Sequence, residues 1–248
     1  MAQNRGDDTL LEMHQAFRKG DRKKLEQLLP AARGHALEPW AAYWELRARL
    51  AEASQQEIQG FLQRYAGTYQ EDRLRNDWLL LLGQRRDWPR FAEQHPLFRM
   101  SDDREVRCYA LLIEQIKGTA PATVAEDVRS NWYAQRDADD GCTHAAGELY
   151  SYKLLAPLDI WRKARLGAEA NRPRVVRNAV EIVAPEAMGR LREVLDAPSW
   201  RWLGINQANA GLTIIRVRSA KPPALVTHND LGHLPPELRT GLPVEQPY

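Results

Sequence analysis

Apolar residues recur every three or four positions through the first 205 residues, which is the period of an amphipathic helix. One example is the stripe of Leu10, Met13, His14 and Phe17, which stops at Gly20, a residue type that favours the ends of helices. No segment in this part alternates as a strand. The pattern predicts helices over residues 10–20, 25–30, 37–51, 54–65, 70–85, 88–91, 102–118, 122–133, 141–155, 158–168, 173–183 and 185–195.

A short motif of a cap residue, an apolar residue four positions later and a following proline occurs three times. Its copies are Asp21, Leu25 and Pro30; Asp87, Phe91 and Pro96; and Asn171, Val175 and Pro185. The Asp or Asn is a typical helix N-cap, the apolar residue fits a core position, and the proline ends the helix. These signals are common in helical chains, so the motif leaves true repeats and coincidence both open.

Several of the expected helices are short, and short helices are marginal unless they pack on neighbours. Successive helical hairpins satisfy this requirement by stacking on one another. We therefore predict an all-α fold for residues 1–205, a superhelical array of helical hairpins or α-solenoid. The segment 54–57, "SQQE", has the spacing of a capping box, in which the Ser and Glu side chains each accept from the other's backbone amide.

The end of the chain, residues 206–248, has a different composition. It contains six of the 15 prolines and no helical period. The stretch "LTIIRVR", 212–218, fits a strand or a helix fragment, and the remainder cannot form long helices. We predict an irregular or partly disordered tail, not a second domain.

Composition and charge exclude several function classes. The chain has 35 basic and 33 acidic residues, a net charge of +2, so there is no electrostatic argument for binding nucleic acid or a membrane surface. Apolar runs such as Trp78 to Leu82 are far too short to span a membrane. The N-terminal residues lack the apolar core of a signal peptide. As written, the chain is expected to stay in the cytoplasm unless a leader has been removed.

The two cysteines, Cys108 and Cys142, are the main candidates for chemistry. Residue types alone favour two buried free thiols over a disulfide. A metal site formed by the two cysteines and His144 would lack a fourth ligand and the usual closely spaced pairs of ligands. His14, on an apolar helix face, is expected to be a core histidine with its hydrogen bonds satisfied.

Other candidate residues are weaker. His228 and His233 fit solvated loop positions better than a metal pair, and the acidic residues Asp137, Asp139 and Asp140 fit a helix N-terminus. There is no phosphate-binding loop, nucleophile elbow or zinc-protease histidine pair. We expect no catalytic residue, no cofactor and no metal. The aromatic stripe around Trp40 and Trp44 is expected to be core, although a few aromatics could line a sugar-binding groove.

Several segments resemble one protein family when they are taken together. They are "PWAAYWELRARL", "IQGFLQRYAGTYQEDRLRNDWL", "NDWLLLLGQRRDWPRFAEQHP", "REVRCYALL" and "DDGCTHAAGELYSYKLLAPLDIWRKARLGAEANRPRVVRNAV". In this order and spacing they resemble the N-terminal superhelical domain of soluble lytic murein transglycosylases. The resemblance covers about residues 8–200 and is strongest over 40–180.

The resemblance implies a relation to periplasmic enzymes that cleave the bond between N-acetylmuramic acid and N-acetylglucosamine in peptidoglycan. In that family a separate lysozyme-like domain carries the catalytic Glu within a Glu-Ser motif. A single carboxyl suffices there because the sugar's own 6-hydroxyl attacks, unlike in two-carboxylate glycosidases. This sequence contains no Glu-Ser dipeptide and no Gly-Leu-Met-Gln motif. No residue here can take over the catalytic role, and the chain is expected to be inert as a fragment, a frameshifted product or a free-standing module.

The resemblance also implies a location and partners. The location is the periplasm, and the partners are the glycan strands of peptidoglycan together with cell-wall proteins. The periplasm is oxidising, and the family has cysteines at matching positions, so the resemblance favours a Cys108–Cys142 disulfide. The alternative is a tetratricopeptide-like scaffold that binds a protein or peptide and no sugar.

Overall fold

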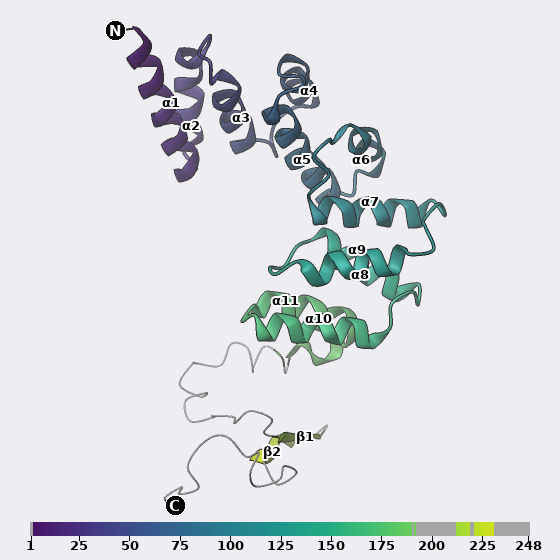
Figure 1. Ribbon diagram of the computed structural model, residues 1–248. Helices are drawn as coiled ribbons and strands as arrows, with labels where there is room; N and C mark the ends of the chain where they lie inside the picture. The colour runs from purple at the N-terminus through teal and green to yellow at the C-terminus, as the bar shows by residue number, and fades with distance from the viewer. Residues whose placement is uncertain (1, 190, 192–211, 219–220, 231–248) are drawn as a thin grey trace, which may run out of the picture. The chain divides into compact units, whose positions relative to one another are not determined.

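The computed structural model describes residues 2–189, 191, 212–218 and 221–230 (Figure 1). Contacts within the chain divide it into two units, Met1–Gly189 and Arg190–Tyr248, which are described separately. The helices of the first unit are α1 (Ala2–Lys19), α2 (Arg22–Leu28), α3 (Glu38–Ala48), α4 (Gln55–Arg64), α5 (Tyr69–Gln84), α6 (Trp88–Gln94), α7 (Arg104–Ile116), α8 (Val124–Ala134), α9 (Gly141–Ser151), α10 (Pro157–Glu169) and α11 (Pro173–Val183). The all-α fold predicted for this part of the chain is confirmed.

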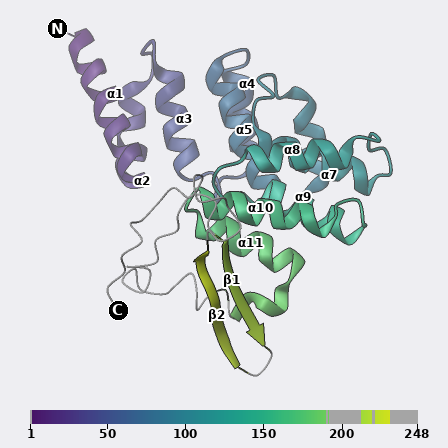
Figure 2. The ribbon, with the colours of Figure 1, turned by 60° about the horizontal axis from the view of Figure 1, so that its bottom comes forward.

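The helices of the first unit are arranged in two layers. The odd-numbered helices pack one after another, α1 on α3, α3 on α5, α5 on α7, α7 on α9 and α9 on α11. The even-numbered helices α2, α4, α6 and α8 each pack on odd-numbered neighbours, and α10 packs on α8 and α11. Figures 1 and 2 show this succession of hairpins along the chain.

Two copies of the short motif have the same local structure. Asp21 caps α2 by accepting from the amide of Lys24 at 3.1 Å, and Asp87 caps α6 by accepting from the amide of Arg90 at 3.4 Å. Each helix has seven residues and continues into a proline-containing 3-10 turn, Leu29–Ala32 or His95–Leu97. The matched caps and turns favour a true repeat of the hairpin.

The third copy differs, because Asn171 is not an N-cap. Asn171 lies between α10 and α11 and has a φ of 52°. Arg172 occupies the N-cap position of α11. The amide of Asn171 donates to Ala168 O at 3.0 Å, and that of Arg172 donates to Gly167 O at 2.8 Å, which is the Schellman arrangement at a helix end. Asn tolerates the left-handed region better than most residues. The predicted cap was therefore wrong by one position, although Val175 is buried as expected.

Two apolar clusters hold the first unit together. The smaller one joins α1 and α2 to α3 and includes Leu10, Met13 and Leu25. The larger one runs from α3 to α7, with Trp78 and Tyr109 among its members. The predicted capping box opens α4 as expected. The Oγ of Ser54 accepts from the amide of Glu57 at 3.3 Å, and the Glu57 carboxylate accepts from the amide of Ser54 at 2.8 Å.

The last helix expected from the sequence is only partly described. Pro185–Ala187 forms a 3-10 turn, and residues 188 and 189 are helical. Residues 190 and 192–195 lie outside the described part. No helix within the described residues has the length and apolar character needed to cross a membrane.

The second unit contains a pair of antiparallel strands, β1 (Leu212–Arg218) and β2 (Lys221–Asp230), with Ile215 opposite Leu225. The sequence left "LTIIRVR" open between strand and helix fragment, and it is a strand. Residues 221–230, expected to be irregular, form the second strand. Pro222 and Pro223 exclude a helix, but proline is tolerated in an edge strand because an edge amide needs no partner. His228 belongs to this strand, whereas His233, the expected boundary at 205 and the rest of the tail lie outside the described residues.

Candidate functional site

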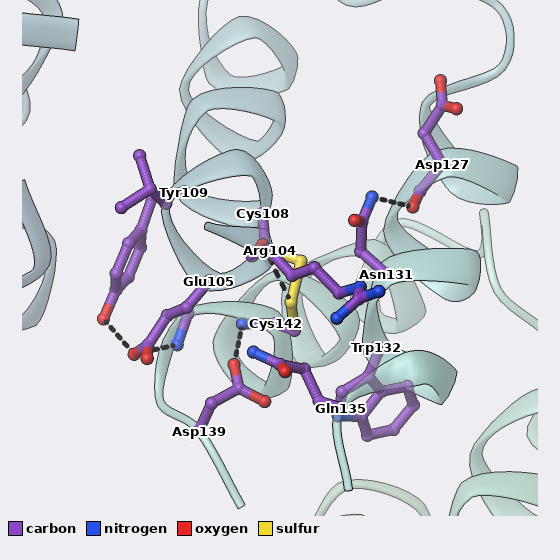
Figure 3. The surroundings of a disulfide bond; sticks show 12 residues. Arg104, Glu105, Cys108, Tyr109, Asp127, Asn131, Trp132, Gln135, Asp139 and Cys142 are labelled. Carbon is purple, nitrogen blue, oxygen red and sulfur yellow. Dashed lines mark hydrogen bonds between the residues drawn. A yellow bond between two sulfur atoms is a disulfide. The ribbon is translucent and has the colours of Figure 1, made fainter. Parts of the chain in front are cut away.

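Cys108 of α7 and Cys142 of α9 form a disulfide with an S–S distance of 2.03 Å (Figure 3). Both residues are fully buried. This is the pairing that the family resemblance implied, whereas residue types alone had favoured free thiols. His144 lies apart from the pair and stacks on Trp88, with 6.4 Å between the ring centroids. Among the described residues, no group of three or more His, Cys, Asp or Glu is placed to hold a metal ion.

A polar junction surrounds Tyr109, close to the disulfide. The Tyr109 hydroxyl donates to Asp140 at 2.5 Å, and Arg86 donates to the same carboxylate at 2.5 Å. Glu105 accepts from the amides of Asp140 and Gly141, both at 3.1 Å. Burial raises the pKa of Glu105 and of the Tyr109 hydroxyl. Because the acids and donors satisfy one another, we interpret this junction as a structural link between the α5–α6 turn, α7 and α9.

Asp139 lies two residues before α9, as expected for an acidic residue near a helix N-terminus. Its Oδ1 accepts from the amide of Cys142 at 2.6 Å (Figure 3), whereas Asp140, at the N-cap position, makes no capping hydrogen bond with its side chain. Its Oδ2 is buried and has no hydrogen-bond partner among the described residues. Burial raises the pKa of Asp139 to about 6.

Lys163 of α10 is a buried charge that the sequence did not reveal. Only 2% of Lys163 is exposed, and its Nζ donates to the carbonyl oxygens of Trp132 and, at 2.6 Å, Gln135. Burial lowers the pKa of Lys163 to about 8, and the nearby Asp139 carboxylate opposes this shift. Two carbonyl acceptors compensate the ammonium for its lost hydration. Lys163 therefore fastens the end of α8 to α10.

The raised pKa of Asp139 predicts a pH dependence of stability. Asp139 binds its proton more tightly in the folded chain, where its pKa is about 6, than in the unfolded chain, where the ordinary value is 3.8. Its contribution is fully present below about pH 4 and is lost as the pH rises through 6. Asp139→Asn removes this titration and keeps an acceptor for the Cys142 amide. We expect the stability of the variant relative to the parent to increase by about 2 kcal/mol between pH 4 and pH 7.

Urea unfolding of both proteins at the two pH values measures this difference. Groups that do not interact with residue 139 titrate alike in the two proteins, so their contributions cancel. A difference that does not change with pH would contradict the raised pKa.

A groove of about 590 Å³ opens between α1 and α3. It is lined by Asp7, Leu10, Leu11, His14, Leu37, Trp40 and Trp44, and we call it the aromatic groove. The Trp40 and Trp44 rings are stacked, with centroids 5.9 Å apart and an angle of 30° between their planes. The exposed ring of Tyr69, at the start of α5, lies 5.7 Å from Trp40.

The prediction for His14 was wrong, and the prediction for the aromatic stripe was only partly right. His14 is exposed and faces Trp44, with 5.2 Å between ring centroids, and is not a core histidine. The stripe was expected to be core, and its Tyr43 is buried, whereas Trp40 and Trp44 are partly buried and pack against the core. Their helix, α3, packs on both α1 and α5. The groove between α1 and α3 leaves the side chains of Trp40 and Trp44 partly uncovered.

A second hollow of about 500 Å³ is lined by residues of α1, α2, α3 and α5, among them three arginines, Arg22, Arg47 and Arg73. Phe17 lines this second hollow, and its ring centroid lies 6.4 Å from those of both Trp44 and Tyr43. The Asp77 carboxylate binds the Tyr43 hydroxyl at 2.7 Å and Arg47 at 2.9 Å. Because residues of α1 and α3 line both hollows, we call the second hollow the basic end of the groove.

No family model and no curated protein matches the chain. The chain is similar to a solved structure described as a complex of the 70-kDa soluble lytic transglycosylase with bulgecin A, with a TM-score of 0.49 and 14% sequence identity. The alignment covers 84% of this chain and 34% of that chain, so this chain spans about a third of the length of the protein it matches.

Proposed function

We propose that this chain is a non-catalytic periplasmic module that holds glycan strands of peptidoglycan in its aromatic groove. One observation carries the proposal. Three rings that are at least partly exposed, those of Trp44, Trp40 and Tyr69, follow one another from α3 to α5 at centroid spacings of 5.9 and 5.7 Å. Because the row consists of several rings and not one, it suits an extended ligand.

The chemistry of the groove matches a sugar chain. The C–H faces of pyranose rings are apolar and pack on aromatic faces, while their hydroxyl and amide groups need hydrogen-bond partners. Asp7 at one side of the groove accepts such bonds, and Arg47 and Arg73 at the basic end donate them.

Two further features support the proposal. The segments that resemble the superhelical domain of lytic transglycosylases include the helix with Trp40 and Trp44, and the sequence has no Glu-Ser dipeptide that could supply their catalytic acid. A buried disulfide between α7 and α9 fits an oxidising compartment such as the periplasm.

The test is retention of the chain on purified murein sacculi stripped of bound protein. Replacement of Trp40 by Ala removes the central ring of the row, and we expect it to weaken retention roughly three- to tenfold. Trp161→Ala is the matched control, because Trp161 is a partly exposed tryptophan of α10 that does not line the groove. Circular dichroism of both variants establishes that they are folded.

A protein-binding scaffold of the tetratricopeptide kind is the second candidate. The rim of the groove favours it, since Leu11 is 62% exposed and Leu37 is 49% exposed, and apolar rims suit the face of a partner helix. Soluble glycan fragments released from sacculi distinguish the two functions, because they compete for retention only if the groove binds sugar. Equal retention of the parent and Trp40→Ala, unaffected by these fragments, would reject glycan binding in the groove.

A further inference from the structure

A separate hollow of about 360 Å³ lies between α9 and α11, which we call the polar cleft. Its lining includes Asp139, His144, Glu148, Arg174, Asn178 and Glu181. It shares no residue with the aromatic groove or its basic end. It is large enough for a small ligand.

Two helix faces form the opposing walls of the polar cleft. His144 and Glu148 are four residues apart on α9, and Arg174, Asn178 and Glu181 are spaced by four and three on α11, so each set lies on one face of its helix. Gly147 lies at the point where the helices meet, and a Cβ there would lie 3.7 Å from Ile182 Cγ1. The missing side chain at Gly147 leaves the space between the two faces open.

The charges of the cleft are only partly compensated. Arg86 and Asp140 pair with each other at its edge. Among the described residues, by contrast, no hydrogen bond or ion pair engages the side chains of Glu148, Arg174, Asn178 or Glu181. The buried Oδ2 of Asp139, also in the lining, is without a partner there. The cavity is therefore lined by one cationic group and several anionic groups that do not pair with one another. Such a lining matches a ligand that carries both a negative and a positive charge.

We propose that the polar cleft binds a zwitterionic ligand, a short peptide with a free ammonium and a free carboxylate. Arg174 binds the carboxylate, for which its guanidinium has the matching planar geometry. Glu148 and Glu181 bind the ammonium, and Asn178, between Arg174 and Glu181 on the same face, bonds to the amide. This site is independent of glycan binding in the aromatic groove.

The test uses the dipeptide alanylalanine with free termini, its N-acetylated form and its C-amidated form, titrated into the full chain and followed by NMR. We expect the free dipeptide to shift resonances of α9 and α11 and to bind roughly tenfold more tightly than either capped form, since each cap removes one charged contact. Arg174→Gln should bind the free and the amidated dipeptides equally. Glu181→Gln should lose most of the preference for the free dipeptide over the acetylated one.

Two further variants separate binding from folding. Gly147→Leu fills the cavity and should abolish binding, whereas Gly147→Ala makes an ordinary contact with Ile182 and should fold normally. Arg165→Gln, at an exposed position on α10, is the control for loss of one arginine and should bind like the parent.

The proposal is overturned if the free dipeptide shifts no resonance of the polar cleft, or if the parent chain binds the free and amidated dipeptides with equal affinity. Trp40→Ala should leave dipeptide binding unchanged. Loss of sacculus retention and loss of dipeptide binding therefore report on the two sites separately.

Discussion

Reduction of the Cys108–Cys142 disulfide is expected to lower the free energy of unfolding by about 3–4 kcal/mol. The bond joins residues separated by 34 positions, and in the chain-entropy account a closed loop of this length restricts the unfolded chain by that amount. The loop includes all of α8, so the bond also holds α7 and α9 at the ends of a three-helix segment. Both half-cystines are fully buried, and reduction should be slow until the chain is partly unfolded.

Denaturant unfolding with and without a reductant measures this effect. The double variant Cys108→Ala and Cys142→Ala should be destabilised by a similar amount, and reductant should not change its unfolding midpoint. Mass spectrometry after alkylation establishes the redox state of each sample. If the parent has the same midpoint when its thiols are shown to be reduced, the disulfide does not contribute to stability.

Gly83→Ala is expected to destabilise the chain by about 3 kcal/mol through overpacking. A Cβ at position 83 would lie 2.3 Å from the Tyr109 ring, and the nearest ring atoms belong to a side chain that is fully buried. The ring cannot withdraw, because it packs against Phe91 and Trp88 at centroid distances of 5.9 and 6.0 Å and its hydroxyl is bound to Asp140. The helix α5 would have to move away from α7.

Gly60→Ala is the matched control for this variant. Gly60 is also inside a helix, α4, and an added Cβ meets nothing within 4 Å. Ala is the better helix former, so this change should stabilise the chain by about 0.5–1 kcal/mol. In a Tyr109→Leu background the destabilisation caused by Gly83→Ala should fall to near zero. Urea unfolding of the parent, the two single variants and the double variant measures this coupling between residues 83 and 109. Equal costs in both backgrounds would show that the Tyr109 ring is not the cause.

The aromatic groove and the polar cleft occupy different parts of the first unit. The aromatic groove and its basic end are lined by residues of α1, α2, α3 and α5, whereas the polar cleft lies between α9 and α11. The Tyr109 junction, which links α5, α7 and α9, shares Arg86 and Asp140 with the edge of the polar cleft. Variants at Trp40 and Arg174 thus test binding, and variants at Gly83 and the cysteines test the scaffold.

Local patterns in the sequence determined the helices. The three-and-four spacing of apolar residues predicts the α-helices of the first unit, and most of their ends differ from those in the structure by a few residues, whereas α1 begins eight residues before its predicted start at residue 10. The cap at Asp21, the cap at Asp87 and the capping box at Ser54 were predicted from neighbouring residues alone. These features depend on contacts between residues three or four positions apart, so sequence spacing is enough to reveal them.

The tertiary structure decided which side chains are covered. The same apolar spacing occurs whether a stripe faces a neighbouring helix or an open groove, so the sequence could not show that His14, Trp40 and Trp44 line a surface hollow. Lys163 has no local signal for burial, because its two acceptors, Trp132 and Gln135, come from α8 and the residue that follows it. The polar cleft likewise exists only because α11 packs against α9 at Gly147. Helices form through contacts close in sequence, whereas sites form where segments distant in sequence meet.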